Sequence, residues 1–139
     1  MMENKVNAKK IETLSSYLMR VEQRCPPDLD ELLSDLDAQD VLTLNLSRAI
    51  QLCVDISLHI LSSNNQTVPQ TMADAFTGLV KEGIISVDTE EKMRKAVGFR
   101  NIAIHEYEKI NWAIVYAIAT ERMVDFRVFA KTISELLND

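Results

Sequence analysis

The sequence predicts an all-α protein, a helical bundle of about five helices that spans residues 1–139 as a single domain. Long stretches carry apolar residues at every third or fourth position, which favours helices over strands. Only three Gly and three Pro interrupt the chain. Hydrophobic residues make up 47% of the chain and charged residues 26%, which is typical of a protein with a packed core and argues against disorder.

The first helix is expected over residues 4–24, because its apolar residues recur at helical spacing and Pro26-Pro27 follows as a helix stop. Residues 28–40, the acidic segment, contain six acidic residues and no basic residue. Since the net charge of the whole chain is −6, the rest of the chain is neutral overall. The acidic segment is either a solvated helix face or loop, or a docking strip for a basic partner.

The second helix is expected over residues 41–62. Its own apolar residues lie on nearly all of its sides, so it should lie at the centre of the bundle. Its charged exceptions are Arg48, Asp55 and His59, which follow one another at spacings of seven and four residues and therefore share one side. These three residues either pair with one another or line a shared cleft.

Local signals delimit two further helices. Thr71 with Asp74 three residues later predicts the start of a short helix, which Gly83 ends. Asp88 with Glu91 at the third following position predicts the start of a helix that ends between residues 105 and 108.

The last helix is expected to begin after Asn111, whose side chain is suited to cap it. Apolar residues keep three-and-four spacing from residue 112 to residue 137, which predicts one helix of seven turns. Such a regular stripe is typical of a core face and not of a cofactor site.

Arg100 lies where its own helix should be apolar, in the stripe Met93, Val97, Arg100, Ile104. Burial of a guanidinium costs several kcal/mol unless an anion or a hydrogen-bonding network meets it. Asn101 follows directly, and His105 lies four residues after Asn101 on the same helical face. Arginine, histidine and an amide are the residue types that cleavage of a phosphodiester requires, so the position predicts a phosphate partner.

Other chemistries find little support in the sequence. Cys25 and Cys53 are isolated and are expected to be reduced thiols, because they have neither metal-ligand nor disulfide-framework spacing. His59 and His105 lack the neighbouring ligands of a metal site, so no metal or other cofactor is expected. No apolar run appears long enough for a membrane span and no signal peptide is recognisable, which predicts a cytoplasmic protein.

The string Arg100-Asn101-x-x-x-His105 near the end of the penultimate long helix resembles the HEPN superfamily, and within it the HepT toxins of toxin–antitoxin modules. The resemblance extends from about residue 41 to residue 137. The resemblance rests on two segments, residues 44–56 and residues 93–107. The second segment includes the flanking Val97-Gly98-Phe99 and the downstream Tyr107.

This resemblance implies a metal-independent endoribonuclease that acts within a homodimer, with tRNA as the substrate that the family suggests. Arg100 would stabilise phosphate and transition-state charge, His105 would transfer protons, and Asn101 would orient His105 or the scissile phosphate. One histidine cannot easily serve both ends of an in-line displacement, and a two-fold dimer brings two copies of the motif to one cleft.

The resemblance also implies a partner, a nucleotidyltransferase antitoxin of the MntA type, which would neutralise the toxin by attaching AMP to Tyr107. Without the resemblance, Tyr107 would be taken for a packed aromatic residue at a helix end, and His105 for a capping or core residue. The alternative function is that of a non-catalytic partner or substrate-binding subunit of a minimal nucleotidyltransferase. Such a subunit would not need Arg100, Asn101 and His105 in this array.

Overall fold

The computed structural model describes the backbone of residues 2–138 and the side chains of residues 5–138, and every regular element in this part of the chain is helical. Two short turns complete the α-helices: a 3₁₀ turn over Tyr107–Lys109 after the fifth α-helix, and a π-helical turn over Ile118–Arg122 after the sixth. The expected all-α fold is confirmed, and its α-helices are α1 (Met2–Arg24), α2 (Leu29–Ser34), α3 (Leu36–Ser63), α4 (Asp74–Lys81), α5 (Val87–His105), α6 (Trp112–Ala117) and α7 (Met123–Leu137).

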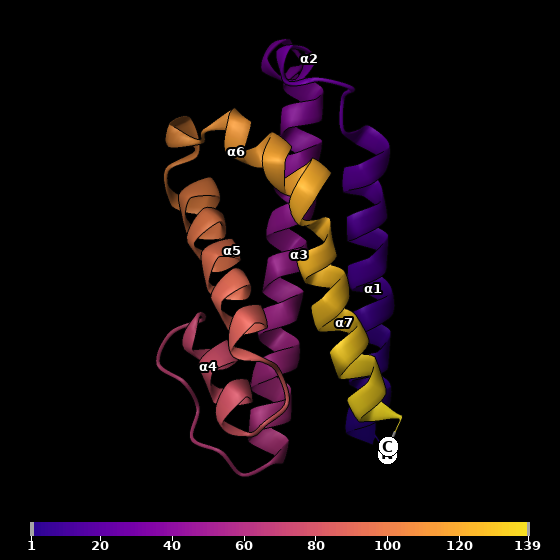
Figure 1. Cartoon of the computed structure of the whole chain (residues 1–139), viewed down its shortest axis with the longest axis vertical. Coiled ribbons are helices and arrows are strands. Elements are labelled where there is room, and N and C mark those ends of the chain that lie inside the picture. The colour runs from indigo at the N-terminus through magenta and orange to yellow at the C-terminus, as the bar shows by residue number, and fades with distance from the viewer. Residues whose placement is uncertain (1, 139) are drawn as a thin grey trace.

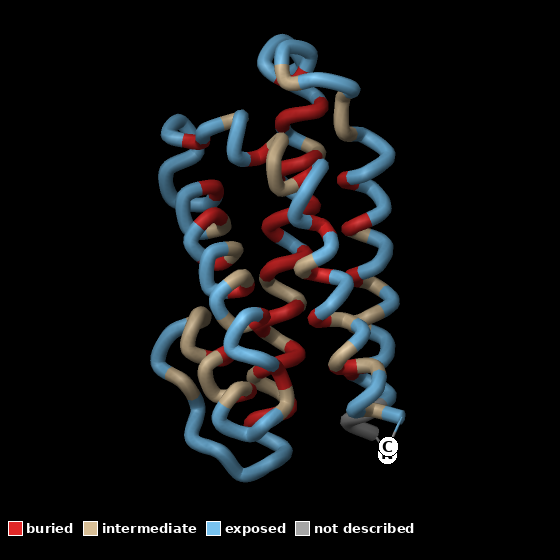
Figure 2. The backbone as a smooth tube through the Cα atoms, in the orientation of Figure 1, coloured by how far each residue is buried: buried red, intermediate tan, exposed pale blue. Residues whose placement is uncertain are grey.

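Helix α3 is the central element of the bundle. It packs against α1 along much of its length and contacts α4 and α5 on its other side, while α2 and α6 meet near its beginning (Figure 1). Buried positions gather along α3 and on the faces of its neighbours that turn toward it (Figure 2). Its side chains Leu42, Leu46, Ile50 and Val54 are at most 1% exposed. The predicted central helix is therefore confirmed.

Helix α3 is also long and apolar enough to cross a membrane, which the sequence analysis did not expect. It is the one helix with this property among the described residues. More than half of its most apolar stretch is buried inside the bundle. The central helix of a soluble helical bundle has the same length and composition, because protein surrounds it instead of lipid.

The acidic segment contains the starts of two helices. The Asp28 side chain accepts a hydrogen bond from the backbone N–H of Glu31 at 2.9 Å and caps α2, and Asp35 accepts one from Ala38 at 3.0 Å and caps α3. Carboxylates at these positions satisfy free N–H groups and interact favourably with the helix dipole. Helix α3 thus begins at Leu36, five residues before the predicted start, because the acidic residues are helix caps and first-turn residues.

The other predicted helix limits hold in part. Asn111 caps α6 by accepting from the backbone N–H of Ala113 at 3.0 Å, and Gly83 ends α4 with a φ of +72° that other residues adopt at a cost. The predicted cap at Asp88 is wrong, since Ser86 caps α5 by accepting from the N–H of Thr89 at 3.1 Å.

The predicted single C-terminal helix is also wrong. The π-helical turn separates α6 from α7, and the Thr120 hydroxyl donates to the Tyr116 carbonyl within this turn at 2.7 Å. A π-turn inserts one extra residue into a helix. The apolar stripe nevertheless stays in the core on both sides of the turn, with Met123, Phe126 and Ile133 at most 5% exposed.

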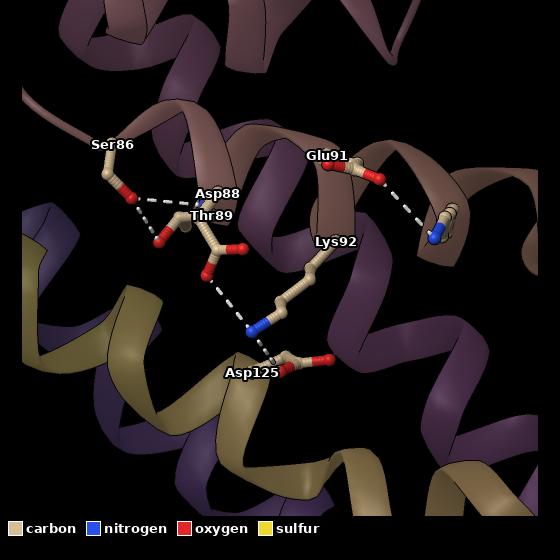
Figure 3. A network of polar contacts seen from close by, with 7 residues as sticks. Ser86, Asp88, Thr89, Glu91, Lys92 and Asp125 are labelled. Carbon is tan, nitrogen blue, oxygen red and sulfur yellow. Dashed lines mark hydrogen bonds and ion pairs between the residues drawn. The ribbon is translucent and has the colours of Figure 1, made fainter.

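Polar contacts fix the first half of α5 on two sides. The Lys92 ammonium lies 3.0 Å from Asp88 of its own helix and 3.8 Å from Asp125 of α7 (Figure 3). On the other side, Arg94 donates to Asp74 of α4 at 3.1 Å. Ion pairs near solvent contribute little stability each, because water screens them. Together with the buried side chains of α5 they set where the second half of the helix lies.

Candidate functional site

The second half of α5 and the first half of α3 border a surface depression of about 460 Å³, called the α3–α5 depression below. Its floor is mostly apolar, and it lies where two helices diverge from close contact. Charged or hydroxyl-bearing side chains from three elements reach it, so a polar ligand would meet apolar walls there. These side chains are Asp40, Thr43, Ser47 and Arg48 of α3, Arg100 of α5, and Tyr107 of the 3₁₀ turn.

Arg100 lines this depression and is half-buried. Its Nε atom is buried and has no hydrogen-bond partner among the described residues. Its Nη1 atom lies 3.5 Å from the Met72 sulfur, which is a weak acceptor. A guanidinium has five N–H donors and keeps its charge at any physiological pH. Arg100 therefore has N–H donors available to bind an anion that enters the depression.

Asn101 and His105 lie on a different side of the same helix. Both side chains are exposed, and neither lines the α3–α5 depression. His105 is the last residue of α5. It lies five positions after Arg100, which turns the two side chains about 140° apart around the helix axis. Within one chain, Arg100 faces the depression, whereas Asn101 and His105 face outward beside its rim.

Tyr107 lines the depression just beyond the end of α5. Its hydroxyl donates to an Asp40 carboxylate oxygen at 2.6 Å, and its ring packs edge-to-face against Trp112 with ring centroids 5.9 Å apart. Desolvation, then the hydrogen bond and charge of Asp40, raise the pKa of Tyr107 to about 12, while Thr43 acts in the opposite direction. The residue is still 41% exposed, so its hydroxyl is held in place and remains near solvent.

The structure separates the three charged residues that the sequence placed on one side of α3. Arg48 lines the depression. Asp55 lies farther along the helix and accepts a hydrogen bond from the Gln51 amide at 2.8 Å. His59 bonds the Asn7 side chain of α1 through its Nδ1 atom at 3.1 Å. Of the three, Arg48 is the one that lines the depression with Arg100, and its guanidinium lies 5.8 Å from the centroid of the Tyr17 ring of α1.

Sequence reasoning missed Asp40 and Met72 as neighbours of the motif. Asp40 is 67 residues from Tyr107 in sequence and was counted only as one charge of the acidic segment. Met72 lies in the connection between α3 and α4, where no periodic pattern predicts what it contacts. Both contacts join segments that are far apart in the sequence and arise only from tertiary packing, so no sequence signal was present to find them.

The cysteines do not contribute a nucleophile. Cys53 is fully buried, and burial raises the pKa of its thiol, so it stays protonated and unreactive. Burial also raises the pKa of Cys25, which is half-buried. Among the described residues, His, Cys, Asp and Glu side chains form no group of three that is suited to hold a metal ion.

Comparison with known proteins identifies the family of this chain. The family model described as "Ribonuclease HepT-like" matches residues 14–133. The chain belongs to the HepT-like ribonuclease family. The resemblance to HEPN proteins that the sequence indicated is therefore confirmed, and the protein is an endoribonuclease by family.

Two curated relatives are similar over nearly their whole length. The mRNA nuclease HepT of Shewanella oneidensis is 32% identical over 94% of this chain and 97% of its own. The tRNA nuclease HepT of Aphanizomenon flos-aquae is 25% identical over 92% of this chain and 87% of its own. A solved structure of the tri-AMPylated Shewanella oneidensis HEPN toxin in complex with MNT antitoxin superimposes with a TM-score of 0.88, at 32% identity over 94% of this chain and 97% of that one.

The contact between Tyr107 and Asp40 predicts a specific titration behaviour. The hydrogen bond needs a protonated phenol, and the pKa of Tyr107 is raised from 10 to about 12. The stabilisation that the bond provides is therefore complete below about pH 10 and is lost as the pH rises through about 12. Asp40→Asn removes the charge, so an ultraviolet titration of this variant should show one tyrosine ionising at lower pH than in the wild type. Asp37→Asn is the control, and identical curves for the wild type and Asp40→Asn would contradict the contact.

Proposed function

We propose that this protein is the toxin of a toxin–antitoxin pair and cleaves RNA in the cytoplasm, without a metal ion, as a homodimer of single-domain chains. The observation that carries the proposal is Arg100, whose half-buried guanidinium lines the depression, has an Nε–H without a partner among the described residues, and contacts the Met72 sulfur through Nη1. A side chain in this state binds a phosphate with little further loss of solvation. A non-catalytic partner subunit would have no use for it.

The residues present suffice for transesterification by a ribose 2′-hydroxyl. That reaction needs a base for the hydroxyl, an acid for the leaving oxygen, and positive charge for the phosphorane. Arg100 supplies the charge, with Arg48 beside it in the depression. His105 transfers protons, and Asn101, four residues earlier on the same face of α5, orients His105 or the scissile phosphate.

A second copy of the chain completes this site. Arg100 and His105 of one chain face different directions, and one histidine does not easily act as base and acid on opposite sides of the phosphorus. The exposed apolar side chains Leu44 and Ile104 line the depression, and each is 48% exposed. A two-fold interface over this surface buries them and places both histidines beside one cleft.

The substrate class is RNA. One relative is named for mRNA and the other for tRNA, so the tRNA substrate that the resemblance suggested stays a prediction. No side chain of the depression forms a pattern that selects a base. Recognition by shape and by unpaired nucleotides suits such a surface.

The partner is a nucleotidyltransferase antitoxin that attaches AMP to Tyr107. The Shewanella oneidensis toxin was solved in its tri-AMPylated form with its MNT antitoxin. Tyr107 is exposed enough for modification and lines the same depression as Arg48 and Arg100. Each AMP adds about one negative charge and bulk, so the added phosphate pairs with these arginines and repels RNA.

Alanine substitutions test the catalytic assignment. In buffer that contains EDTA, the wild type should cleave RNA, whereas His105→Ala should lose about 10²-fold or more of the rate because proton transfer is gone. Arg100→Ala should lose cleavage and keep its melting temperature, since the unpaired guanidinium does not stabilise the fold. Arg20→Ala, an exposed arginine of α1, is the matched control and should stay active. Cleavage by His105→Ala at the wild-type rate, or an absolute need for a metal ion, would contradict the assignment.

Removal of the Tyr107 hydroxyl tests the neutralisation. Tyr107→Phe should remain a nuclease and escape silencing when it is produced with the partner, because it offers no oxygen for AMP. Intact-mass measurement after incubation with the partner and ATP should show whole AMP units on the wild type and on the control Tyr116→Phe, and none on Tyr107→Phe. A wild-type toxin that the partner silences while Tyr107 stays unmodified would point to inhibition by binding alone.

A further inference from the structure

Asp40 is an unexpected residue in a depression that receives RNA. It lines the same surface as Arg48 and Arg100. A carboxylate there repels phosphate and reduces the positive potential that the two arginines create. Nuclease action gives no reason for its presence, so its role is to be sought in its contact with Tyr107.

The Asp40–Tyr107 contact is built from rigid parts. Asp40 lies in the second turn of α3, and the capping bond of Asp35 together with the Gln39 amide, which donates to the Leu32 carbonyl at 2.9 Å, fixes the beginning of that helix. Tyr107 begins the 3₁₀ turn after α5 and packs against Trp112. The hydroxyl is thus held toward the carboxylate before any partner binds.

The geometry suits proton transfer. A distance of 2.6 Å between the Tyr107 and Asp40 oxygens is typical of a strong O–H···O⁻ hydrogen bond. A phenol attacks phosphorus poorly while it keeps its proton, and the raised pKa of Tyr107 keeps that proton in place at neutral pH. A base in contact with the hydroxyl removes this barrier, and Asp40 is the carboxylate in contact.

We propose that Asp40 is the general base for AMP transfer to Tyr107, an inference that rests on the proposed modification of this residue. The Tyr107 oxygen forms a bond to the α-phosphorus of ATP while its proton passes to the Asp40 carboxylate. The bond between the α-phosphorus and the bridging oxygen breaks, and pyrophosphate leaves. Asp40 then releases the proton to water. The toxin thereby supplies part of the catalytic machinery for its own neutralisation.

Asp40→Asn isolates this role, because the amide keeps an oxygen that accepts the hydrogen bond and has no affinity for the proton. With the partner and ATP, the initial rate of AMP addition at Tyr107 should fall about 10²-fold or more in the variant. The pH profile should also change. Between about pH 7 and 9 the wild-type rate should be nearly flat, and the variant rate should rise about tenfold per pH unit as hydroxide replaces the base. The other charged groups of the depression are Arg48 and Arg100, and guanidinium groups do not titrate in this pH range.

Two further variants serve as controls. Asp37→Asn removes an exposed carboxylate of the same acidic segment and should keep the wild-type rate and profile. Asp40→Glu keeps a carboxylate on a longer side chain and should retain a flat profile with a rate within about tenfold of the wild type. Circular dichroism and co-purification with the partner establish that each variant is folded and bound.

The outcomes separate the inference from the function on which it rests. If wild-type Tyr107 is modified and Asp40→Asn is modified at the same rate with the same flat profile, Asp40 is not the base and the proposed function stands. A hydroxide-dependent profile for Asp40→Glu would also overturn the role of Asp40. If wild-type Tyr107 receives no AMP from an active partner, the proposed modification fails and the inference fails with it.

Discussion

The half-buried guanidinium of Arg100 is the constraint around which the functional part of this protein is arranged. In the part of the chain that the structure describes, its Nε atom is enclosed without a partner, and its Nη1 atom contacts the Met72 thioether. Such an arrangement costs free energy in the free protein, and the buried core around α3 offsets that cost. The site is therefore prepared for an anion before the anion arrives, and little reorganisation is needed when a phosphate enters.

The helices on either side of α5 make this arrangement possible. Lys92 and Arg94 fix the first half of the helix toward α7 and α4, and the buried side chains of its second half pack on α3. The same packing brings Asp40 within hydrogen-bonding distance of Tyr107. One depression therefore holds Arg100 and Tyr107, whereas His105 and Asn101 lie outside it. In the proposed function, an AMP group on Tyr107 would thus lie in the same depression as Arg100.

Sequence reasoning found what depends on local pattern. Helical periodicity predicted the bundle and its central helix, and the apolar stripe around Arg100 predicted that this side chain is partly buried. Sequence reasoning failed where contacts between distant segments determine the local structure. The start of α3 was misplaced because acidic residues that cap helices look like a solvated run, and the π-turn at residues 118–122 keeps the apolar spacing of a continuous helix. The Asp40–Tyr107 pair forms only through tertiary packing.

The central claim is that two chains share one cleft in which both copies of His105 act. A mixing experiment with wild-type and His105→Ala chains tests it most directly, once native mass spectrometry has shown that the chains exchange freely. If both histidines are needed, only pure wild-type dimers cleave, and at equal amounts of the two chains about a quarter of the activity per dimer should remain. A loss in simple proportion to the wild-type fraction, with half of the activity remaining, would show that each chain acts alone and would contradict the shared cleft.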